Sequence, residues 1–453
     1  MKREKLHDAL NLLPDELVQP VHELRAKGRA KKKIGRWVGL AACLCAAVAA
    51  VFVPLTPRAI AAENLMEGVE ANPVTEVADL RENAAAVTDF AVRLFQTGMT
   101  EDNVNTLISP LSVLCALAMT ANGAEGETLT QMEEVLGLDV DTLNGWLYTY
   151  MKNLPQSEKA KLNLANSVWF KQDEKFEVEQ DFLQTNADYY GASIYGAPFD
   201  DRTLKDVNRW VADNTDGVIP EILSELPKDA VMLLVNALAF DAEWQNIYRE
   251  TQVRDGVFTT EFGKIKEVDM MHCIEYAYLE DELATGFIKY YAGGDYAFAA
   301  LLPNEGVGVA NYAASLTGEG LWRTLRSASD AEVITAMPKF ETETSLELNE
   351  ALKAMGMPKA FDDVLAEFYG IGSYQGESLY ISKVQHKTFL TVDEKGTKAG
   401  AAAAVVMEPT DSAPPEDEPE PKRVILDRPF LYLLIDCKTN TPIFIGSMMN
   451  PTV

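Results

Sequence analysis

The sequence predicts an α+β fold, because segments with helical periodicity come mainly first and strand-like segments come mainly later. Neither an internal repeat nor a long linker divides residues 75–453. We therefore expect one domain of about 375 residues at 79–453, preceded by a linker at 56–78. This length and a hydrophobic content of 47% suffice for a sizeable core.

Three helices are predicted at the start of the domain. Apolar residues recur at helical spacing over 87–98, in "VTDFAVRLFQTG". A second helix runs from the "SPLSV" motif to the Asn122-Gly123 break, because this dipeptide is a typical stop signal. A third helix is expected to begin near Gly126.

Strand-like segments dominate the later part of the chain. They are 162–170, 230–240, 296–303, 384–394, 430–437 and 442–449. The second and third are almost continuously apolar, which is typical of strands covered on both faces. The fourth, "VQHKTFLTVDE", alternates with period two, which is typical of a strand with one buried face.

Charge and cysteine content exclude several classes of protein. The net charge of -29 argues against nucleic acid or an anionic membrane surface as the main partner. Five cysteines, two of them in the apolar stretch at 37–55 and three far apart, do not form a disulfide framework or a CxxC metal site. We expect Cys115, Cys273 and Cys437 to be small buried side chains.

The N-terminal region carries a membrane-targeting pattern. A basic tail at 1–36 precedes 19 uncharged residues at 37–55, a length that can cross a bilayer core. The basic flank predicts a cytoplasmic N-terminus and an exported domain. A single-pass signal anchor, a cleaved signal ending at Ala59-Ile60-Ala61, a lipoprotein signal at Cys43 and a buried core helix are the alternatives.

Hydrolase chemistry is not indicated. A Ser-His-Asp triad needs a histidine base beside a nucleophile, and only His272 and His386 follow the apolar stretch. The chain has no G-x-S-x-G elbow, no HExxH motif and no phosphate-binding glycine loop. His386, within an alternating strand, is expected to be a hydrogen-bonded core residue, and the chain is not expected to be an enzyme.

The segment 394–423, "EKGTKAGAAAAVVMEPTDSAPPEDEPEPKR", combines two characters. Read as a strand, residues 397–408 place Lys398 and Glu408 on one face and no charge on the other. The part after Glu408 is rich in proline and acidic residues, which favours a solvated loop. An alanine-rich linker or a helix followed by a loop also fits this pattern.

The segment also resembles the hinge of the serpin family, at the base of its reactive-centre loop. Further motifs resemble the family in order from about residue 80 to the end. They are "NTLISPLSVLCALAMTANGAEGETLTQM", "LNLANSVWF", "VNRWVADNTDGVIPEIL", "LLVNALAFDAEW", "LNEALKAMGMPKAF" and "DRPFLYLLIDCKTNTPIFIGSMMNP". The resemblance implies three β-sheets, eight to nine helices and an exposed reactive-centre loop at about 394–423.

Inhibitory serpins offer this loop to a target protease. The protease forms an acyl-enzyme, the cleaved loop inserts into the main sheet, and the protease is trapped covalently. The resemblance therefore implies an inhibitor of serine proteases that acts as a monomer without a cofactor or metal. Fourteen residues, 397–410, span about 46 Å at roughly 3.3 Å each, a reach that suits this transfer. A non-inhibitory serpin-fold binding protein is the alternative.

Matching the family residue by residue assigns roles to particular positions. The hinge comprises Glu394, Gly396, Thr397, Ala399, Gly400, Ala401, Ala402 and Ala403. The shutter, a polar cluster that controls sheet opening, comprises Ser109, Ser112, Asn236 and His386. Trp244 matches the breach, where the loop first enters the sheet. Gly400 and Ala403 depart from the usual residues, but neither blocks insertion by size or charge.

Two positions fit the cleaved bond, because the stretch that follows it, through "EDEPEP", is longer than is usual in the family. Counting forward from the hinge gives Thr410–Asp411, and aligning "SAPP" to the family pattern gives Asp411–Ser412. No lysine or arginine lies between Lys398 and Lys422, which argues against a trypsin-like target. We expect an elastase-like or subtilisin-like serine protease, with a papain-like cysteine protease as the alternative.

Overall fold

The computed structural model describes residues 60–75, 78–99, 104–155, 157–172, 176–227, 230–374, 376–398 and 420–451. The described residues from Ile60 onward form one compact unit. No helix in the described part of the chain is both long and apolar enough to span a bilayer. The predicted tail at 1–36 and span at 37–55 lie outside the described residues, so the predicted division of the chain stays a prediction.

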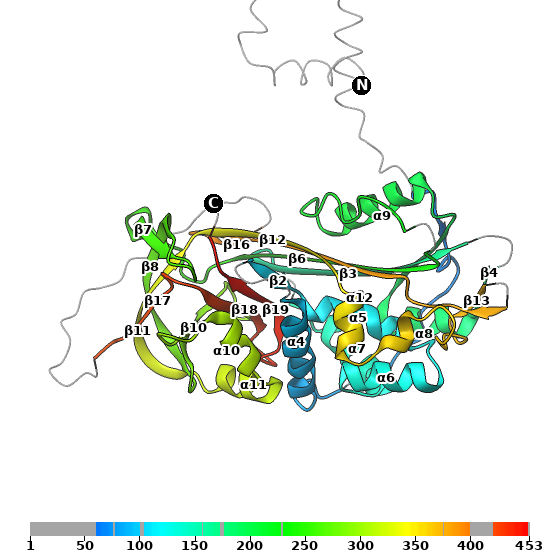
Figure 1. The fold of residues 1–453 in the computed structure, drawn as a ribbon, viewed down its shortest axis with the longest axis horizontal. Coiled ribbons are helices and arrows are strands. Elements are labelled where there is room, and N and C mark those ends of the chain that lie inside the picture. Colours follow the sequence, from blue (N-terminus) through cyan, green and yellow to red (C-terminus); the bar gives the residue numbers. More distant parts are fainter. Residues whose placement is uncertain are drawn as a thin grey trace, which may run out of the picture. The chain divides into compact units, whose positions relative to one another are not determined.

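Three sheets organise the compact unit (Figure 1). The seven-stranded sheet has the order β1 (Glu63–Asn64), β5 (Ser193–Ala197), β3 (Ala160–Lys171), β6 (Met232–Glu243), β16 (Gly396–Lys398), β15 (Lys383–Val392) and β12 (Phe340–Glu347). The nine-stranded sheet has the order β17 (Lys422–Ile425), β11 (Ser329–Pro338), β8 (Ile265–Glu280), β9 (Ala284–Tyr290), β10 (Tyr296–Pro303), β18 (Phe430–Asp436), β19 (Pro442–Met448) and β2 (Thr106–Ile108), and β7 (Val253–Thr259) pairs with β8. The third sheet comprises β14 (Glu377–Ser378), β13 (Gly372–Tyr374) and β4 (Phe176–Val178).

Nine α-helices are present among the described residues, which confirms the predicted count and the α+β class. They are α4 (Ala84–Gly98), α5 (Pro110–Ala121), α6 (Gly126–Leu136), α7 (Val140–Lys152), α8 (Gln180–Tyr190), α9 (Asp201–Asn214), α10 (Val309–Ser315), α11 (Gly318–Arg326) and α12 (Asn349–Met355). Two 3-10 helices, η1 (Glu250–Gln252) and η2 (Pro358–Phe361), complete the set. The three predicted helices correspond to α4, α5 and α6.

Local signals explain where these helices begin and end. The side chain of Ser109 accepts a hydrogen bond from the backbone N–H of Ser112 and so caps α5, whose first residue is Pro110. Gly137 ends α6 in a left-handed conformation that favours glycine. Every residue of α5 is buried, because this helix lies beneath the seven-stranded sheet.

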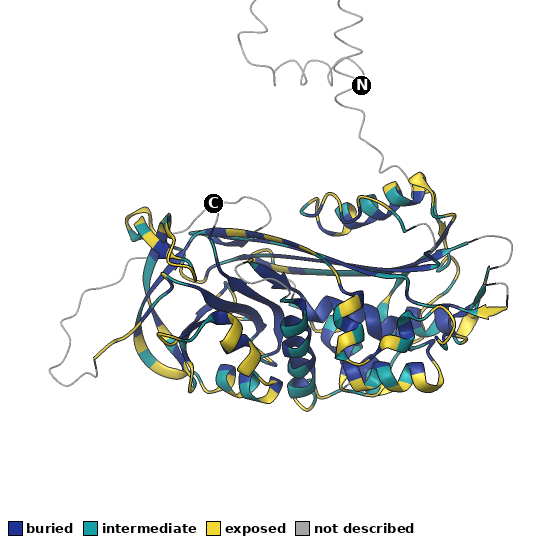
Figure 2. Ribbon diagram, viewed as in Figure 1, coloured by how far each residue is buried: buried dark blue, intermediate teal, exposed yellow. Residues whose placement is uncertain are grey.

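The seven-stranded sheet is covered on both faces around β3 and β6, whereas its edge strand β12 alternates between buried and exposed residues. Helix α5 contacts β3 and β6 from one side, and α9 contacts the same strands from the other (Figure 1). β6 is buried over its first nine residues, as its continuous apolar sequence predicts, whereas its neighbours β3 and β15 mix buried residues with partly exposed ones (Figure 2). The structure therefore embeds β6 between a large core on the α5 side and a smaller core under α9.

The segment after Ala59 packs along this unit. β1 extends the sheet edge by pairing antiparallel with β5. The carboxylate of Asp206, on α9, accepts hydrogen bonds from the backbone N–H groups of Ala61 (2.9 Å) and Ala62 (3.1 Å). Residues 61–65, which fall within the predicted linker at 56–78, therefore contact α9 and the sheet edge.

Replacing Asp206 by alanine is expected to loosen this attachment. The side chain is buried, and each charge-assisted hydrogen bond contributes about 1.5–3 kcal/mol. We therefore expect the free energy of unfolding to fall by roughly 2 kcal/mol or more. The midpoint of urea-induced unfolding checks this. Asp213→Ala, at an exposed position of the same helix, is the control. Equal shifts in the two variants would contradict the role of Asp206.

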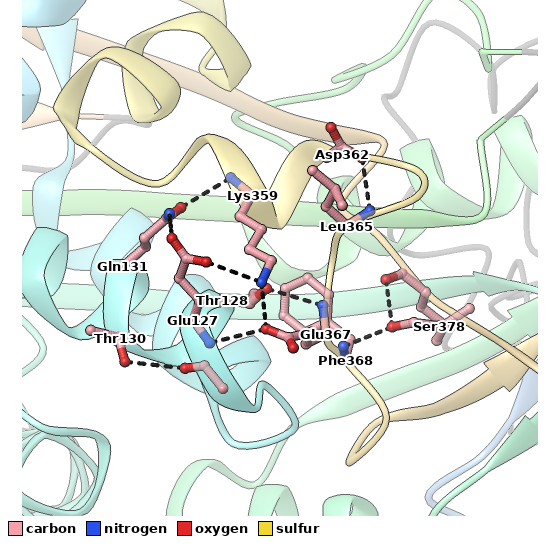
Figure 3. Close-up of polar contacts among 12 residues, drawn as sticks. Glu127, Thr128, Thr130, Gln131, Lys359, Asp362, Leu365, Glu367, Phe368 and Ser378 are labelled. Carbon is pink, nitrogen blue, oxygen red and sulfur yellow. Dashed lines mark hydrogen bonds and ion pairs between the residues drawn. The ribbon is translucent and has the colours of Figure 1, made fainter.

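A polar cluster fixes the loop that leads into β15 (Figure 3). The carboxylate of Glu367 accepts a hydrogen bond from the backbone N–H of Glu127 at the start of α6 (3.0 Å) and pairs with the ammonium of Lys359 (2.7 Å). Further along the chain, just before β15, the backbone N–H of Ser382 donates to the carbonyl of Met232. This loop therefore sets the start of β15 beside the start of β6.

Candidate functional site: a partly occupied seam between two strands

The seam between β6 and β15 is open at one end and closed at the other. At the closed end, β6 and β15 pair directly and in parallel, from Leu233↔Lys383 to Ala237↔Lys387. At the open end, β16 lies between them and pairs antiparallel with both. The chain after β15 has thus turned back and entered its own sheet.

A tight turn makes this entry possible. The side chain of Asp393 accepts hydrogen bonds from the backbone N–H groups of Lys395 (2.7 Å) and Gly396 (3.0 Å). A Cβ atom on Gly396 would lie 2.0 Å from the carbonyl oxygen of Ala242, so only glycine permits this approach to β6. We define residues 393–398 as the hinge base.

Thr397 points into the core from the hinge base. Its side chain is 0% exposed, and its hydroxyl shares a hydrogen bond with the hydroxyl of Tyr291, just after β9. The ring of Tyr291 stacks on Trp244 with centroids 4.4 Å apart and planes at 11°. The first inserted side chain is therefore received by an aromatic pair.

Trp244, Tyr248 and Lys339 hold the turn itself. The indole N–H of Trp244 donates to the carbonyl of Asp393 (2.8 Å), and its backbone N–H donates to that of Lys395 (2.8 Å). The backbone N–H of Tyr248 donates to the carbonyl of Glu394 (2.9 Å). The ammonium of Lys339 pairs with the carboxylate of Glu394 at 2.8 Å and holds the pKa of that carboxyl below its ordinary value.

A buried polar cluster lies at the closed end, and we call Ser109, Ser112, Asn236 and His386 the seam cluster. Asn236 and His386 are partners in the β6–β15 register, and His386 Nδ1 lies 3.0 Å from Asn236 Oδ1. The Ser112 hydroxyl donates to that same oxygen (3.2 Å), and the amide of Asn236 donates to the Ser112 carbonyl (2.9 Å). The backbone N–H of Ser109 donates to His386 Nε2 (3.0 Å).

These bonds connect three elements. Side chains from β6 and β15 meet across the seam, and both bind the first turn of α5 beneath it. His386 Nε2 accepts a hydrogen bond, so a neutral ring carries its proton on Nδ1 and donates to Asn236. His386 is therefore the hydrogen-bonded core residue that its sequence context predicts.

Burial lowers the pKa of His386 to about 3. In the unfolded chain the ordinary value is about 6.5, so between these pH values the unfolded state binds a proton that the folded state does not. Stability therefore falls as the pH decreases through this window. We expect the melting temperature to decline between pH 6.5 and 5, before most carboxylates titrate.

His386→Gln is expected to flatten this decline even though it lowers stability at pH 7. The comparison is His272→Gln: burial also lowers the pKa of His272, but this side chain is only half-buried and lies away from the seam, so its loss is expected to flatten the decline less than the loss of His386. The carboxyl of Asp436, whose pKa burial raises, contributes with the opposite sign and is unchanged in both variants. An unaltered slope in His386→Gln would contradict the assignment.

The structure brings all the predicted site residues that it describes into this one seam. Ser109, Ser112, Asn236, His386, Trp244, Glu394, Gly396 and Thr397 all lie along it. Ala399, Gly400, Ala401, Ala402, Ala403 and the candidate cleavage residues Thr410, Asp411 and Ser412 lie outside the described residues. The cysteines Cys115, Cys273 and Cys437 are free, the first buried and the others half-buried.

Tyr291 and Lys339 are site residues that sequence reasoning missed. Their contacts with Thr397 and Glu394 join positions far apart in the chain, and no local pattern marks them. The β7–β8 hairpin was not predicted either, although the alternation in "KEVDM" at 266–270 is a signal that could have found it.

Comparison with known proteins agrees with this architecture. The family model described as serpin (serine protease inhibitor) matches residues 85–451. The thermophilic serpin tengpin in its native state has a TM-score of 0.80 and 44% identity, covering 86% of this chain and 99% of that chain. Tengpin in its latent state has a TM-score of 0.73 and 41% identity, covering 84% and 100%.

Two relatives show similar coverage. An uncharacterised serpin-like protein of Thermococcus kodakarensis is 31% identical over 81% of this chain and 85% of its own. The leukocyte elastase inhibitor of Bos taurus is 30% identical over 81% of this chain and 99% of its own. The chain belongs to the serpin family, as the sequence motifs predict.

Proposed function

We propose that this chain inhibits serine proteases by the suicide mechanism, in which the cleaved reactive-centre loop inserts along the seam and traps the protease. One observation carries the proposal. β16 already occupies the open end of the seam in antiparallel register with β6, with Gly396 opposite Glu243 and Thr397 opposite Ala242. The loop thus starts in the position that insertion would extend.

The register supports an insertion of suitable length. Each step forward along the loop moves one residue back along β6, so continued pairing sets Met407 opposite Met232, the first residue of β6. The predicted cleavage residue Thr410 comes three positions later. The inserted strand would then fill β6 to its end, with a short tether left to carry the acylated protease.

The side chains fit this register as well. Thr397 faces the core, so residues 399, 401, 403, 405 and 407 would follow it inward, and all are alanine, valine or methionine. Lys398 and Glu408 would lie on the opposite face. Insertion along the seam therefore buries no charge on the core side.

We assign gating roles to two parts of the seam, the seam cluster and Trp244. The hydrogen bonds of the seam cluster across β6 and β15 have to break before an inserting strand can separate these two strands. The seam cluster therefore acts as the shutter that controls sheet opening. Trp244, stacked on Tyr291 and bonded to the hinge base, acts at the breach. These buried hydrogen bonds keep the seam closed until insertion supplies new ladder bonds.

The proposed target is an elastase-like or subtilisin-like serine protease, cleaving at Thr410–Asp411 or Asp411–Ser412. The small β-branched side chain of Thr410 and the lack of lysine and arginine from 399 to 421 support this class. The name of the bovine relative, an inhibitor of leukocyte elastase, points the same way. Trapping of a papain-like cysteine protease is the alternative within the same mechanism.

The test is to mix residues 60–453, the compact unit, with an elastase-like, a subtilisin-like, a papain-like and a trypsin-like protease. A covalent band of summed mass on a denaturing gel is expected with the first or second, and the sequence of the released C-terminal peptide fixes the bond. Clean cleavage by all four, without such a band and without a rise in melting temperature, would favour a non-inhibitory binding protein.

We further propose that residues 37–55 direct the domain out of the cytoplasm, either as a single-pass anchor or as a cleaved signal. Support comes from the uncharged stretch and its basic flank. Fractionation of cells that produce the full chain tests this proposal. Recovery of the domain in the cytoplasmic fraction would contradict it.

A further inference from the structure

The hydroxyl of Tyr291 is a fixed contact point for the hinge base. Its ring is fully buried, stacks on Trp244 and meets Phe240 edge-on at 5.1 Å. The backbone of Tyr291 is held too, because its N–H donates to the carbonyl of Tyr296 (3.0 Å) and it forms a β-bridge with Trp244. The hydroxyl therefore has little freedom to follow Thr397 if β16 moves.

The hydroxyls of Thr397 and Tyr291 are hydrogen-bonded to each other in a site that is buried from solvent. Both side chains are fully buried, and a buried hydroxyl that loses its only partner keeps the cost of desolvation. Burial raises the pKa of Tyr291 well above its ordinary value, so the phenol stays neutral and able to donate over the physiological range. Departure of β16 from the sheet would remove this partner.

We propose that Tyr291 is a positioning residue whose hydroxyl latches Thr397, and with it strand β16, into the open end of the seam before any protease binds. The latch itself follows from the geometry, whereas its kinetic consequence rests on the proposed function. With the first inserted residues already in register, insertion after cleavage extends an existing strand and does not have to start one. A hinge base released from the sheet would have to re-enter before insertion could proceed.

Tyr291→Phe keeps the stacked ring and removes only the hydroxyl. One net hydrogen bond corresponds to about a five-fold change in an equilibrium, equivalent to about 1 kcal/mol. We expect amide hydrogen exchange at residues 396–398 to be about five-fold faster in this variant of the uncleaved chain, because exchange reports local opening. Thr397→Val, which keeps the branched shape without the hydroxyl, is expected to give the same acceleration.

Three further variants make the exchange measurement specific. The double variant Tyr291→Phe, Thr397→Val is expected to exchange no faster than either single variant, because both remove the same bond. Thr397→Ser retains a hydroxyl and is expected to restore slow exchange. Tyr290→Phe, at the partly exposed neighbouring tyrosine, is the matched control and is expected to leave exchange unchanged.

A second measurement separates this inference from the proposed function. With a protease that forms the covalent complex, slower insertion in Tyr291→Phe should raise the ratio of cleaved to trapped inhibitor by about five-fold. If no protease is trapped, the proposed function fails. Amide exchange at residues 396–398 still tests whether the Tyr291 hydroxyl holds β16 in the seam. Unchanged amide exchange at 396–398 in Tyr291→Phe, or an equal acceleration in the distant strand β19, would overturn the positioning role of Tyr291.

Discussion

Replacing Thr397 by arginine is expected to convert the chain from an inhibitor into a substrate of its target protease. The wild-type side chain is fully buried in the seam, in hydrogen-bond contact with Tyr291. A guanidinium at this point would be a buried charge without a counter-ion, which costs several kcal/mol. Insertion would therefore stop at its first residue, and water would hydrolyse the acyl-enzyme.

We expect the yield of covalent complex to fall at least about a hundred-fold, since every 1.4 kcal/mol corresponds to a factor of ten. A denaturing gel with the protease identified for the wild-type chain measures this yield. Lys395→Arg is the control, because it changes a half-buried residue of the same turn without changing its charge. Persistence of the complex in Thr397→Arg would show that inhibition does not require residue 397 to stay buried in the sheet.

Removing the amide of Asn236 is expected to have the largest effect on the closed seam. In Asn236→Ala the hydroxyl of Ser112, the carbonyl of Ser112 and His386 Nδ1 each lose a hydrogen-bond partner in the core. Unsatisfied buried groups cost about 1–3 kcal/mol each, and partial relaxation reduces the sum. We therefore expect the free energy of unfolding to fall by about 3 kcal/mol. Amide exchange along residues 233–237 should accelerate in parallel.

Chemical denaturation followed by circular dichroism measures the first effect, and exchange measures the second. Asn163→Ala is the matched control, because Asn163 lies on the adjacent strand β3 and its amide donates to Asp216 at the surface. This control is expected to change stability by less than about 0.5 kcal/mol. Similar losses in both variants would mean that the seam cluster has no special part in holding the strands together.

The helices and most long strands could be predicted because their signals are local. Apolar spacing and a glycine stop mark α5 and its end at Ala121, and continuous apolar residues mark β6 as a strand with two covered faces. For residues 397–408, the pattern left open an alternating strand and, as the alternative, an alanine-rich linker or a helix followed by a loop. The structure supports the strand at Gly396–Lys398, and later residues of that segment lie outside its description.

The site was predicted in part, and through family resemblance more than through pattern. Ser109, Ser112, Asn236 and His386 are unremarkable in the sequence, since a polar residue in an apolar run is as consistent with plain core packing as with a gate. Their convergence depends on the register that sets Asn236 beside His386, which are 150 positions apart. Sequence spacing cannot encode that register, because strand pairing depends on the whole packed core.

By itself the sequence determined the α+β class and a segment at 397–408 that can form a strand, because composition, periodicity and charge act over short stretches. Only the tertiary structure decided that β16 already lies between β6 and β15, and that Tyr291 receives Thr397 there. The physical reason is that both outcomes depend on long-range contacts: a hydroxyl buried by one part of the chain finds its partner in another.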